Sequence, residues 1–144
     1  MKLGLADYSA LAELRYQIRR FQHFSEQAAR QARLEPQQHQ LLLAIKGLPE
    51  GRRARIGELA ERMQTQHHST VELVNRLAAR GFVRRHRSTE DRREVLLEVT
   101  SKGEQVLQRL SLDHSAELRT QGPVLVAALN LAMRTAVKAG KDTQ

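Results

Sequence analysis

Hydrophobic side chains recur at helical spacing near the beginning of the chain. The stripe is formed by Leu11, Leu14, Ile18 and Phe21. Intervals of three and four residues place these side chains on one face of a helix. Since neither Pro nor Gly occurs between residues 7 and 33, the pattern predicts one long amphipathic helix over that range. Glu35-Pro36 ends this helix, and Pro36 suits the first turn of a second helix that carries QLLLAI.

The central part of the chain contains a loop and two further helical segments. GLPEGRRAR, residues 47–55, has two Gly and one Pro, which predicts a loop that leads into a very short strand near Arg55-Ile56. IGELAERM, residues 56–63, has apolar side chains at helical spacing and predicts a short helix. A turn at Gln64-Thr65 leads to QHHSTVELVNRLAAR, a helical segment that Gly81 ends.

This last segment has two distinct faces. The inward face follows the i, i+3, i+4, i+7 pattern and consists of Thr70, Leu73, Val74 and Leu77. At about 100° per residue, the opposite face consists of His68, Glu72 and Asn75, flanked by Ser69 and Arg76. The segment is therefore predicted to bury one face and to present polar side chains on the other.

The hydrophobic period changes from 3.6 to two after Gly81. FVRRH is followed by the polar residues 88–91, and then Val95, Leu97 and Val99 alternate with Glu94, Leu96 and Glu98. This pattern predicts two short strands around a turn, although Leu96 weakens the alternation. Taken alone, RRHRSTEDRREV, residues 84–95, fits either a disordered basic tail or the tip of a folded hairpin. The helix before it and the alternation after it favour the hairpin.

The C-terminal part is predicted to be helical. Thr100 is a good N-cap, with Gly103 tolerated in the first turn. The helix that follows contains Val106, Leu107, Leu110 and Leu118. Gly122-Pro123 predicts a break, and a final helix over residues 124–139 is apolar nearly all round its first two turns.

Charge is distributed unevenly along the chain, whose net charge is +8. Residues 52–93 contain eleven Arg and five acidic residues, a net charge of +6, and the remaining 102 residues carry a net charge of +2. This asymmetry favours an anionic partner for the middle segment, nucleic acid before membrane. A solvated basic face is the alternative, and charge alone does not decide between them.

Composition limits the location and the chemistry of the protein. The chain has no Cys, which excludes disulfides, cysteine-based zinc sites and thiol chemistry and fits a reducing cytoplasm. The N-terminal residues show no apolar core of a signal peptide. The most apolar segment, residues 124–133, is far shorter than the roughly 20 residues of a membrane span. We therefore expect a cytoplasmic protein without a membrane partner.

The order helix, turn, helix and hairpin, with the basic charge concentrated there, is typical of DNA-binding lobes. In a helix-turn-helix, the second helix lies in the major groove while the first supports it. The polar face of residues 66–80 carries side chains that suit base edges. Glu72 can accept a hydrogen bond from cytosine N4 or pair with Arg76 at i+4. A hairpin wing can reach the adjacent DNA backbone or minor groove. We therefore expect double-stranded DNA as the partner.

The same residues resemble the MarR family of winged helix-turn-helix regulators. The matching positions are Leu59 and Ala60; Val74, Leu77, Gly81, Val83 and Arg85; Asp91 and Arg93; Val99, Thr100 and Gly103. The motif spans about 50 residues, and the D-x-R and T-x-x-G pair after a helix-turn-helix is its most specific part. Val99 stands where Leu is usual, and Gln64 and Thr65 stand where Gly and an apolar residue are common, so the recognition helix is expected to start within about a residue of Gln66.

The resemblance implies a fold and an assembly. The fold class is mainly α with a small β-wing (α+β), in one domain over residues 1–144. Residues 36–100 would form the winged helix-turn-helix lobe, and residues 1–35 and 101–144 the dimerisation helices. The resemblance also implies a homodimer, a recognition helix that starts near Gln66, and a wing whose Arg93, held by Asp91, enters the minor groove.

The predicted site residues follow from the polar face and the resemblance together. In the recognition helix they are Gln66, His67, His68, Ser69, Glu72, Asn75 and Arg76. In the wing they are Arg84, Arg87, Asp91, Arg92 and Arg93. Arg84, Arg87 and Arg92 are expected to contact phosphates, which give affinity without sequence information.

A homodimer is also expected on physical grounds. A first helix of roughly 40 Å is too long to be covered by a small three-stranded winged lobe, and the apolar final helix needs a partner. Two-fold symmetry would set two recognition helices about 34 Å apart and would predict a pseudo-palindromic site.

Four residues lie on or near helices that, in the MarR family, border an effector pocket: Tyr16, Arg19, His23 and His39. Arg19 and Tyr16 suit an aromatic carboxylate, so a small aromatic or phenolic effector is one hypothesis. Ordinary surface and packing roles are the favoured alternative, because nothing in the spacing selects these residues. His114 follows Leu110 by one turn on an apolar stripe and is predicted to be a hydrogen-bonded core histidine.

Metal binding and catalysis lack a sequence signature. His68 and Glu72 have i, i+4 spacing beside His67, but a zinc site requires three or four ligands. Without a Gly-rich phosphate loop, G-x-S-x-G or H-E-x-x-H, we expect no cofactor, no metal and no enzyme activity. The predicted function is sequence-specific transcription regulation, most often repression in this family. The alternative is an architectural protein that coats DNA with little sequence preference.

Overall fold

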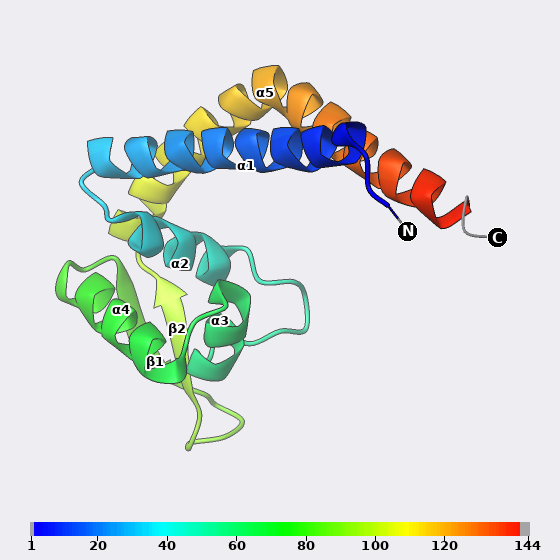
Figure 1. The fold of residues 1–144 in the computed structure, drawn as a ribbon. Helices are drawn as coiled ribbons and strands as arrows, with labels where there is room; N and C mark the ends of the chain where they lie inside the picture. Colours follow the sequence, from blue (N-terminus) through cyan, green and yellow to red (C-terminus); the bar gives the residue numbers. More distant parts are fainter. Residues whose placement is uncertain (1, 142–144) are drawn as a thin grey trace. The chain divides into compact units, whose positions relative to one another are not determined.

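The computed structural model describes the backbone of residues 2–141 and the side chains of residues 2–135. Five helices and one hairpin make up this part of the chain (Figure 1). They are α1 (Leu5–Gln31), α2 (Pro36–Lys46), α3 (Ile56–Met63), α4 (His67–Ala79), β1 (Val83–Arg87), β2 (Val95–Val99) and α5 (Ser101–Lys141). The predicted fold class, mainly helical with a small β-wing, is confirmed. The predicted first helix has its bounds shifted by two residues.

The chain divides into two compact units. A helical unit combines α1 up to Ala28 with α5 from Leu112 onward, and a winged unit spans Ala29–Ser111. The winged unit is longer at both ends than the lobe of residues 36–100 expected from the sequence. The reason is burial, because Leu34, Leu107 and Leu110 are at most 4% exposed. These residues lie outside the lobe of residues 36–100 that the resemblance implied.

The core of the winged unit consists of side chains that the helical spacing places inward. Leu41, Leu42, Leu59, Val74 and Leu77 are fully buried. The buried residues of α4 are Thr70, Leu73, Val74 and Leu77, so the predicted inward face is confirmed. Burying a leucine or valine side chain contributes about 1.5–3 kcal/mol, and these contacts fix α4 against α2 and α3.

The turn between α3 and α4 holds the second helix at a defined angle. Gln64 adopts a left-handed backbone conformation (φ 52°), which a residue with a polar side chain tolerates better than a branched apolar one. Thr65 and the buried Thr70 share a hydrogen bond between their hydroxyl oxygens (2.9 Å). Gln66 is the N-cap of α4, which confirms the predicted start of this helix, and Gly81 (φ 77°) follows its C-terminus.

The wing is a two-stranded antiparallel sheet within the described residues. Val83 faces Val99 and Arg87 faces Val95 in its register. Among the alternating side chains, Leu97 and Val99 are buried, whereas Val95 is 38% exposed. The hairpin is therefore confirmed, and its apolar face is concentrated at the end nearest α5.

The third strand predicted near Arg55-Ile56 is wrong. Arg55 is instead the N-cap of α3 and Ile56 is the first residue of that helix. The loop before α3 makes one backbone contact with the sheet, in which Leu97 N–H donates to the carbonyl of Ala54 (2.8 Å). One such bond ties the loop to β2 without forming a strand.

The break predicted at Gly122-Pro123 is also wrong. Figure 1 shows α5 as one continuous helix, and Pro123 lies inside it. A proline in this position removes the hydrogen bond to the carbonyl four residues earlier. The helix continues because packing holds its next turns, where Ala128 and Ala132 are at most 7% exposed.

The start of α5 explains why threonine and glycine occur three residues apart. Thr100 Oγ1 donates to the carbonyl of Gly81 (2.6 Å) and accepts from Gly103 N–H (3.1 Å). A Cβ at Gly103 would lie 2.2 Å from the carbonyl oxygen of Phe82. Glycine is therefore required here for close approach of backbone, which is a stronger role than the tolerance expected from the sequence.

The helical unit has its own packed contact around His114. The His114 ring nitrogen Nε2 and Ser25 Oγ are 2.8 Å apart. The rings of Phe21 and Phe24 contact the imidazole edge-to-face at 6.0 and 5.3 Å between centroids. The predicted hydrogen bond of His114 is confirmed, but the side chain is half-buried rather than part of the core. None of the helices described combines the length and the apolar character that a membrane span requires.

Candidate nucleic-acid interface

The outward face of α4 is exposed as the sequence predicted. All of the predicted residues on this helix and its N-cap are accessible to solvent. They are Gln66, His67, His68, Ser69, Glu72, Asn75 and Arg76. The face combines donors, acceptors and one guanidinium without a large apolar side chain, so it offers hydrogen-bonding groups of several kinds to a groove of DNA.

Two side chains of this face have partners in the winged unit. Arg76 pairs with Glu35 of the α2 N-cap (Nη1–Oε2, 3.6 Å), rather than with Glu72 as the sequence alternatively suggested. Asn75 Oδ1 accepts a hydrogen bond from Arg85 Nη2 of β1. Because a guanidinium only donates, this contact fixes which way the carboxamide of Asn75 faces and leaves its amide nitrogen available as a donor.

The turn between β1 and β2 is a hydrogen-bonded structure, defined here as the wing turn, residues 88–94. Ser88 is 6% exposed, and its Oγ accepts from the backbone N–H groups of Glu90 (3.2 Å) and Asp91 (3.3 Å). Ser88 N–H donates to the carbonyl of Glu94, and Glu94 N–H to that of Asp91, each at 3.0 Å. The basic run of residues 84–95 is thus the tip of a folded hairpin.

Acidic and basic side chains of the wing have different roles in this turn. Asp91 Oδ1 accepts from the backbone N–H of Arg93 (3.0 Å), so the carboxylate orients the backbone at that residue. Arg84 pairs with Glu98 (2.8 Å), and Arg87 Nη1 donates to the carbonyl of Arg92 (2.8 Å).

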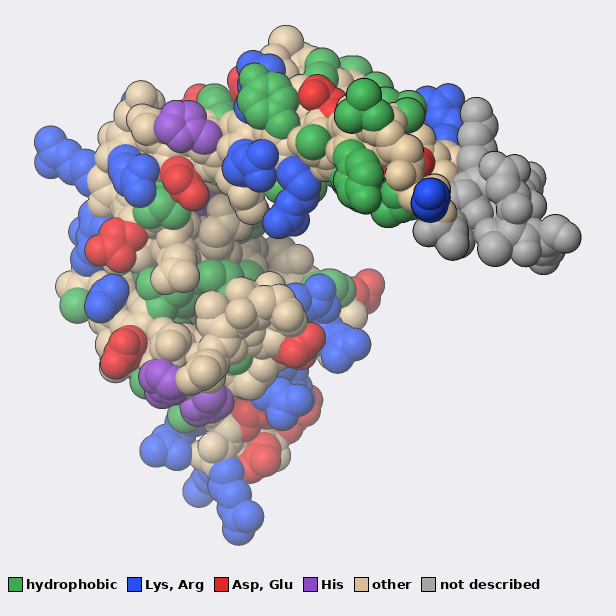
Figure 2. Space-filling model, in the orientation of Figure 1, with side chains coloured by type: hydrophobic (Ala, Val, Ile, Leu, Met, Phe, Trp, Pro, Cys, Tyr) green, Lys and Arg blue, Asp and Glu red, His purple; other side chains and the backbone are tan. Residues whose placement is uncertain are grey.

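Within residues 2–135, the exposed side chains of Arg92 and Arg93 have no carboxylate within ion-pair distance. Figure 2 shows basic side chains gathered at the end of the winged unit that carries the wing turn, with acidic side chains beside them. The cationic groups of Arg92 and Arg93 are therefore available to an anion such as a phosphate.

Arg53 was not predicted as part of the site, yet it contacts the wing turn. Its Nη1 lies 2.6 Å from Glu94 Oε2, and its Nη2 pairs with Glu90. The first of these nitrogens also reaches Ser88 Oγ at 3.5 Å. These partners lie at least 35 residues away in sequence, so no local pattern could have revealed them.

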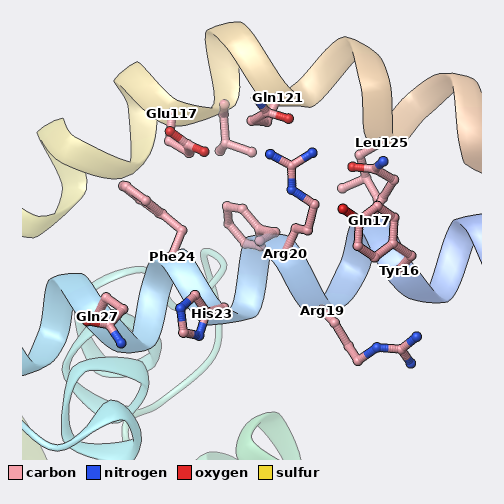
Figure 3. A pocket seen from close by; sticks show the side chains of 12 residues that line it. Tyr16, Gln17, Arg19, Arg20, His23, Phe24, Gln27, Glu117, Gln121 and Leu125 are labelled. Atoms are coloured by element: carbon pink, nitrogen blue, oxygen red, sulfur yellow. The ribbon is translucent and has the colours of Figure 1, made fainter.

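A second candidate site is a cavity in the helical unit, with a volume of about 530 Å³. It is lined by residues of α1 and α5: Tyr16, Gln17, Arg19, Arg20, Phe21, His23, Phe24, Gln27, Glu117, Leu118, Gln121 and Leu125. In Figure 3, Arg20 and Phe24 point from α1 toward α5, whereas Arg19 points away from it. The guanidinium of Arg20 lies 5.8 Å from the centre of the Tyr16 ring.

The cavity is therefore lined by three of the four residues predicted for an effector pocket. Tyr16, Arg19 and His23 line the cavity, and Arg20, which the sequence analysis did not select, is the cation directed across it. His39 belongs to α2 in the winged unit and is 2% exposed. Consecutive residues on a helix point about 100° apart. The hydrophobic spacing of α1 did not show which of the two consecutive arginines faces α5.

Metal ligands do not gather in the described part of the chain. No group of three or more His, Asp or Glu residues among the residues that the structure describes could hold a metal ion.

Comparison with known proteins finds a family match within the winged unit. Residues 34–94 match the sequence model of the MarR family. Over 56 residues the chain is 34% identical to an uncharacterized HTH-type transcriptional regulator, YfiV, of Bacillus subtilis strain 168. This match covers 39% of the chain and 35% of YfiV, so the chain matches about a third of the length of that relative.

Solved structures resemble the chain over nearly its whole length. AbsC, a MarR family transcriptional regulator from Streptomyces coelicolor, matches with a TM-score of 0.74 and 19% identity over 99% of each chain. MepR of S. aureus, in a complex with DNA, matches with a TM-score of 0.62 and 15% identity over 95% of this chain and 98% of the other. A mutant MarR from E. coli bound to operator DNA matches with a TM-score of 0.64 and 18% identity over 85% and 89%. At these identities the likeness shows the fold, which is that of MarR winged helix structures.

Proposed function

Residues 34–94 match the MarR family, and from that premise we propose that the chain is a transcription regulator that binds double-stranded DNA sequence-specifically. One observation carries the proposal. The exposed polar face of α4 and the hydrogen-bonded wing turn belong to the same compact unit. A protein that contacts a major groove and the neighbouring minor groove at the same time requires this arrangement. The family match and the fold support the general activity.

In the proposed complex, α4 lies in the major groove. His68, Asn75 and Glu72 face base edges, and Gln66, His67, Ser69 and Arg76 lie at the ends and flanks of that face. The wing turn reaches the adjacent minor groove with Arg93, whose backbone Asp91 orients. Arg84, Arg87 and Arg92 contact phosphates, and the first two would exchange the internal partners described above for the DNA backbone.

We further propose that the active form is a homodimer with a pseudo-palindromic operator. The helical unit supports this proposal because it exposes large apolar side chains on both of its helices. On α1 they include Leu5 and Tyr8, 83% and 58% exposed, and on α5 Leu112 and Val126, 64% and 55% exposed. Burial of such a surface against a second copy removes it from water. Repression follows when the bound dimer occupies a promoter.

The cavity of the helical unit is the proposed effector site. Its aromatic side chains and the inward guanidinium of Arg20 fit a small aromatic or phenolic anion, with Tyr16 and His23 as further polar contacts. Such a ligand would release DNA by favouring a spacing of the two DNA-binding lobes that does not suit both half-sites. Arg20 takes the role that the sequence analysis gave to Arg19.

A competition titration across salt concentrations tests the proposed function against an architectural, DNA-coating role. Protein-bound genomic fragments are sequenced to find the operator, and its affinity is compared with that of a shuffled duplex. A regulator is expected to keep a specificity ratio of roughly 10³ or more for its operator. A coating protein shows only a steep dependence on salt, and that result would overturn the proposal.

A further inference from the structure

Arg53 lies in the loop between α2 and α3, whose backbone is fixed to the wing sheet. The neighbouring Ala54 accepts the hydrogen bond from Leu97 N–H of β2 (2.8 Å), and Arg55 caps α3. The two residues that follow Arg53 are therefore both held in place. The side chain of Arg53 is 40% exposed and extends to the wing turn.

The guanidinium contacts both ends of the wing turn. One nitrogen binds Glu90, near the beginning, and the other binds Glu94 at its end at 2.6 Å. Glu94 is 18% exposed, so this ion pair is better protected from solvent than the exposed pair with Glu90. The planar fork of arginine can bind two carboxylates with separate N–H groups, whereas lysine presents a single point charge.

The contact also changes the charge that the wing presents. Glu90, Asp91 and Glu94 lie among the wing arginines, and unpaired carboxylates beside DNA phosphates would weaken binding. Arg53 pairs with two of the three. The third, Asp91, is engaged with the backbone of Arg93. Every carboxylate of the wing turn is thus used internally.

We infer that Arg53 is a positioning residue: it fixes the wing turn and neutralises its two glutamates, so that the exposed Arg92 and Arg93 are presented to DNA. The inference rests on the proposed function only for its last step, because the fixing of the wing turn is a property of the free protein. A direct phosphate contact by Arg53 is the competing role, and it makes opposite predictions.

The first experiment uses the full chain without DNA. Backbone amide exchange of residues 88–94 is measured by NMR in the parent protein, Arg53→Ala and Arg53→Lys, with Arg52→Ala as the control. Arg52 is the adjacent exposed arginine, and its ion-pair partner is Glu58 in α3 at 3.8 Å. For an exposed pair of contacts we expect exchange to be about three- to tenfold faster in Arg53→Ala, intermediate in Arg53→Lys, and unchanged in Arg52→Ala. Unchanged exchange in Arg53→Ala would overturn the inference, whatever the protein binds.

The second experiment measures DNA affinity for Arg53→Ala in the parent protein and in a Glu90→Gln/Glu94→Gln background. A positioning role predicts about three- to tenfold weaker binding in the parent, an unchanged salt slope, and less than a twofold effect once the glutamates are neutral. A phosphate contact predicts that the slope falls by about one with the same loss in both backgrounds, and overturns the inference. If faster exchange occurs without any specific DNA binding, the positioning of the turn stands and the proposed function fails.

Discussion

At the scale of single residues, the Asn75–Arg85 hydrogen bond links Asn75 of α4, which we propose faces a base edge, to the wing. The carboxamide of a free asparagine can present either its oxygen or its nitrogen, but Arg85 can bind only the oxygen. Arg85 therefore orients Asn75 so that its amide nitrogen is available to an acceptor on a base edge. We therefore expect Arg85 to contribute to specificity without touching DNA.

We predict that Arg85→Ala relaxes discrimination at the base pair that Asn75 contacts, by about 1–3 kcal/mol. Asn75→Ala should produce the same loss, and the double variant no more than either alone, because the two residues act as one unit. The measurement is binding to operators that carry each of the four bases at every position. His68→Ala is the control on the same face and should change a different position. Additive losses would show that Arg85 acts independently of Asn75.

A second residue-scale prediction concerns the backbone contact at Gly103. Gly103→Ala places a methyl group 2.2 Å from the carbonyl oxygen of Phe82, so either α5 or the β1 entry must shift. Overpacking of this kind costs about 1–3 kcal/mol. The free energy of unfolding, measured in urea at fixed protein concentration, should fall accordingly. Gly57→Ala is the control in α3, where a Cβ meets open space; it should leave stability unchanged or raise it by about 0.5–1 kcal/mol.

At the scale of elements, the hydrophobic periodicity of the sequence predicted the features that depend on residues close together in the chain. The buried face of α4, its N-cap and the hairpin were predictable because their residues are neighbours at helical or alternating spacing. The strand expected at Arg55-Ile56 was not formed, since strand pairing depends on a distant partner that offers only one bond. The break expected at Pro123 ignored the packing that continues α5. Arg53 was not predicted as a site residue because its acidic partners lie 37 and 41 residues away in the sequence.

The continuous α5 leads to a prediction about Pro123. An alanine there can donate the backbone hydrogen bond that proline lacks, so Pro123→Ala should stabilise the protein by about 1–3 kcal/mol. The midpoint of urea unfolding measures the effect. Pro49→Ala is the control in the α2–α3 loop, and loss of a loop proline should destabilise by about 0.4–1 kcal/mol. A lower midpoint for Pro123→Ala would instead show that the helical unit requires the geometry that proline imposes.

At the scale of the whole molecule, the helical unit leaves several large apolar side chains of α5 exposed. Leu112, Val126, Leu129 and Met133 of α5 are each at least 44% exposed, whereas Leu41, Leu42 and Leu59 of the winged unit are fully buried. The sequence pattern identified the apolar segment that forms the later part of α5, but it could not assign a partner to that segment. The proposed second copy accounts for this surface and for the two-fold symmetry of a pseudo-palindromic operator.

We predict that Leu129→Glu separates the dimer while the winged unit remains folded, because a carboxylate in an apolar interface must be desolvated. Leu43→Glu is a matched control, since Leu43 on α2 has the same 44% exposure as Leu129 but belongs to the winged unit. Sedimentation velocity at micromolar concentration should give a dimer for the parent and Leu43→Glu, and a monomer for Leu129→Glu. The monomer should then bind a full operator no more tightly than a half-site. A parent chain that sediments as a monomer would remove the basis for a two-fold operator and leave the apolar face of α5 to another partner.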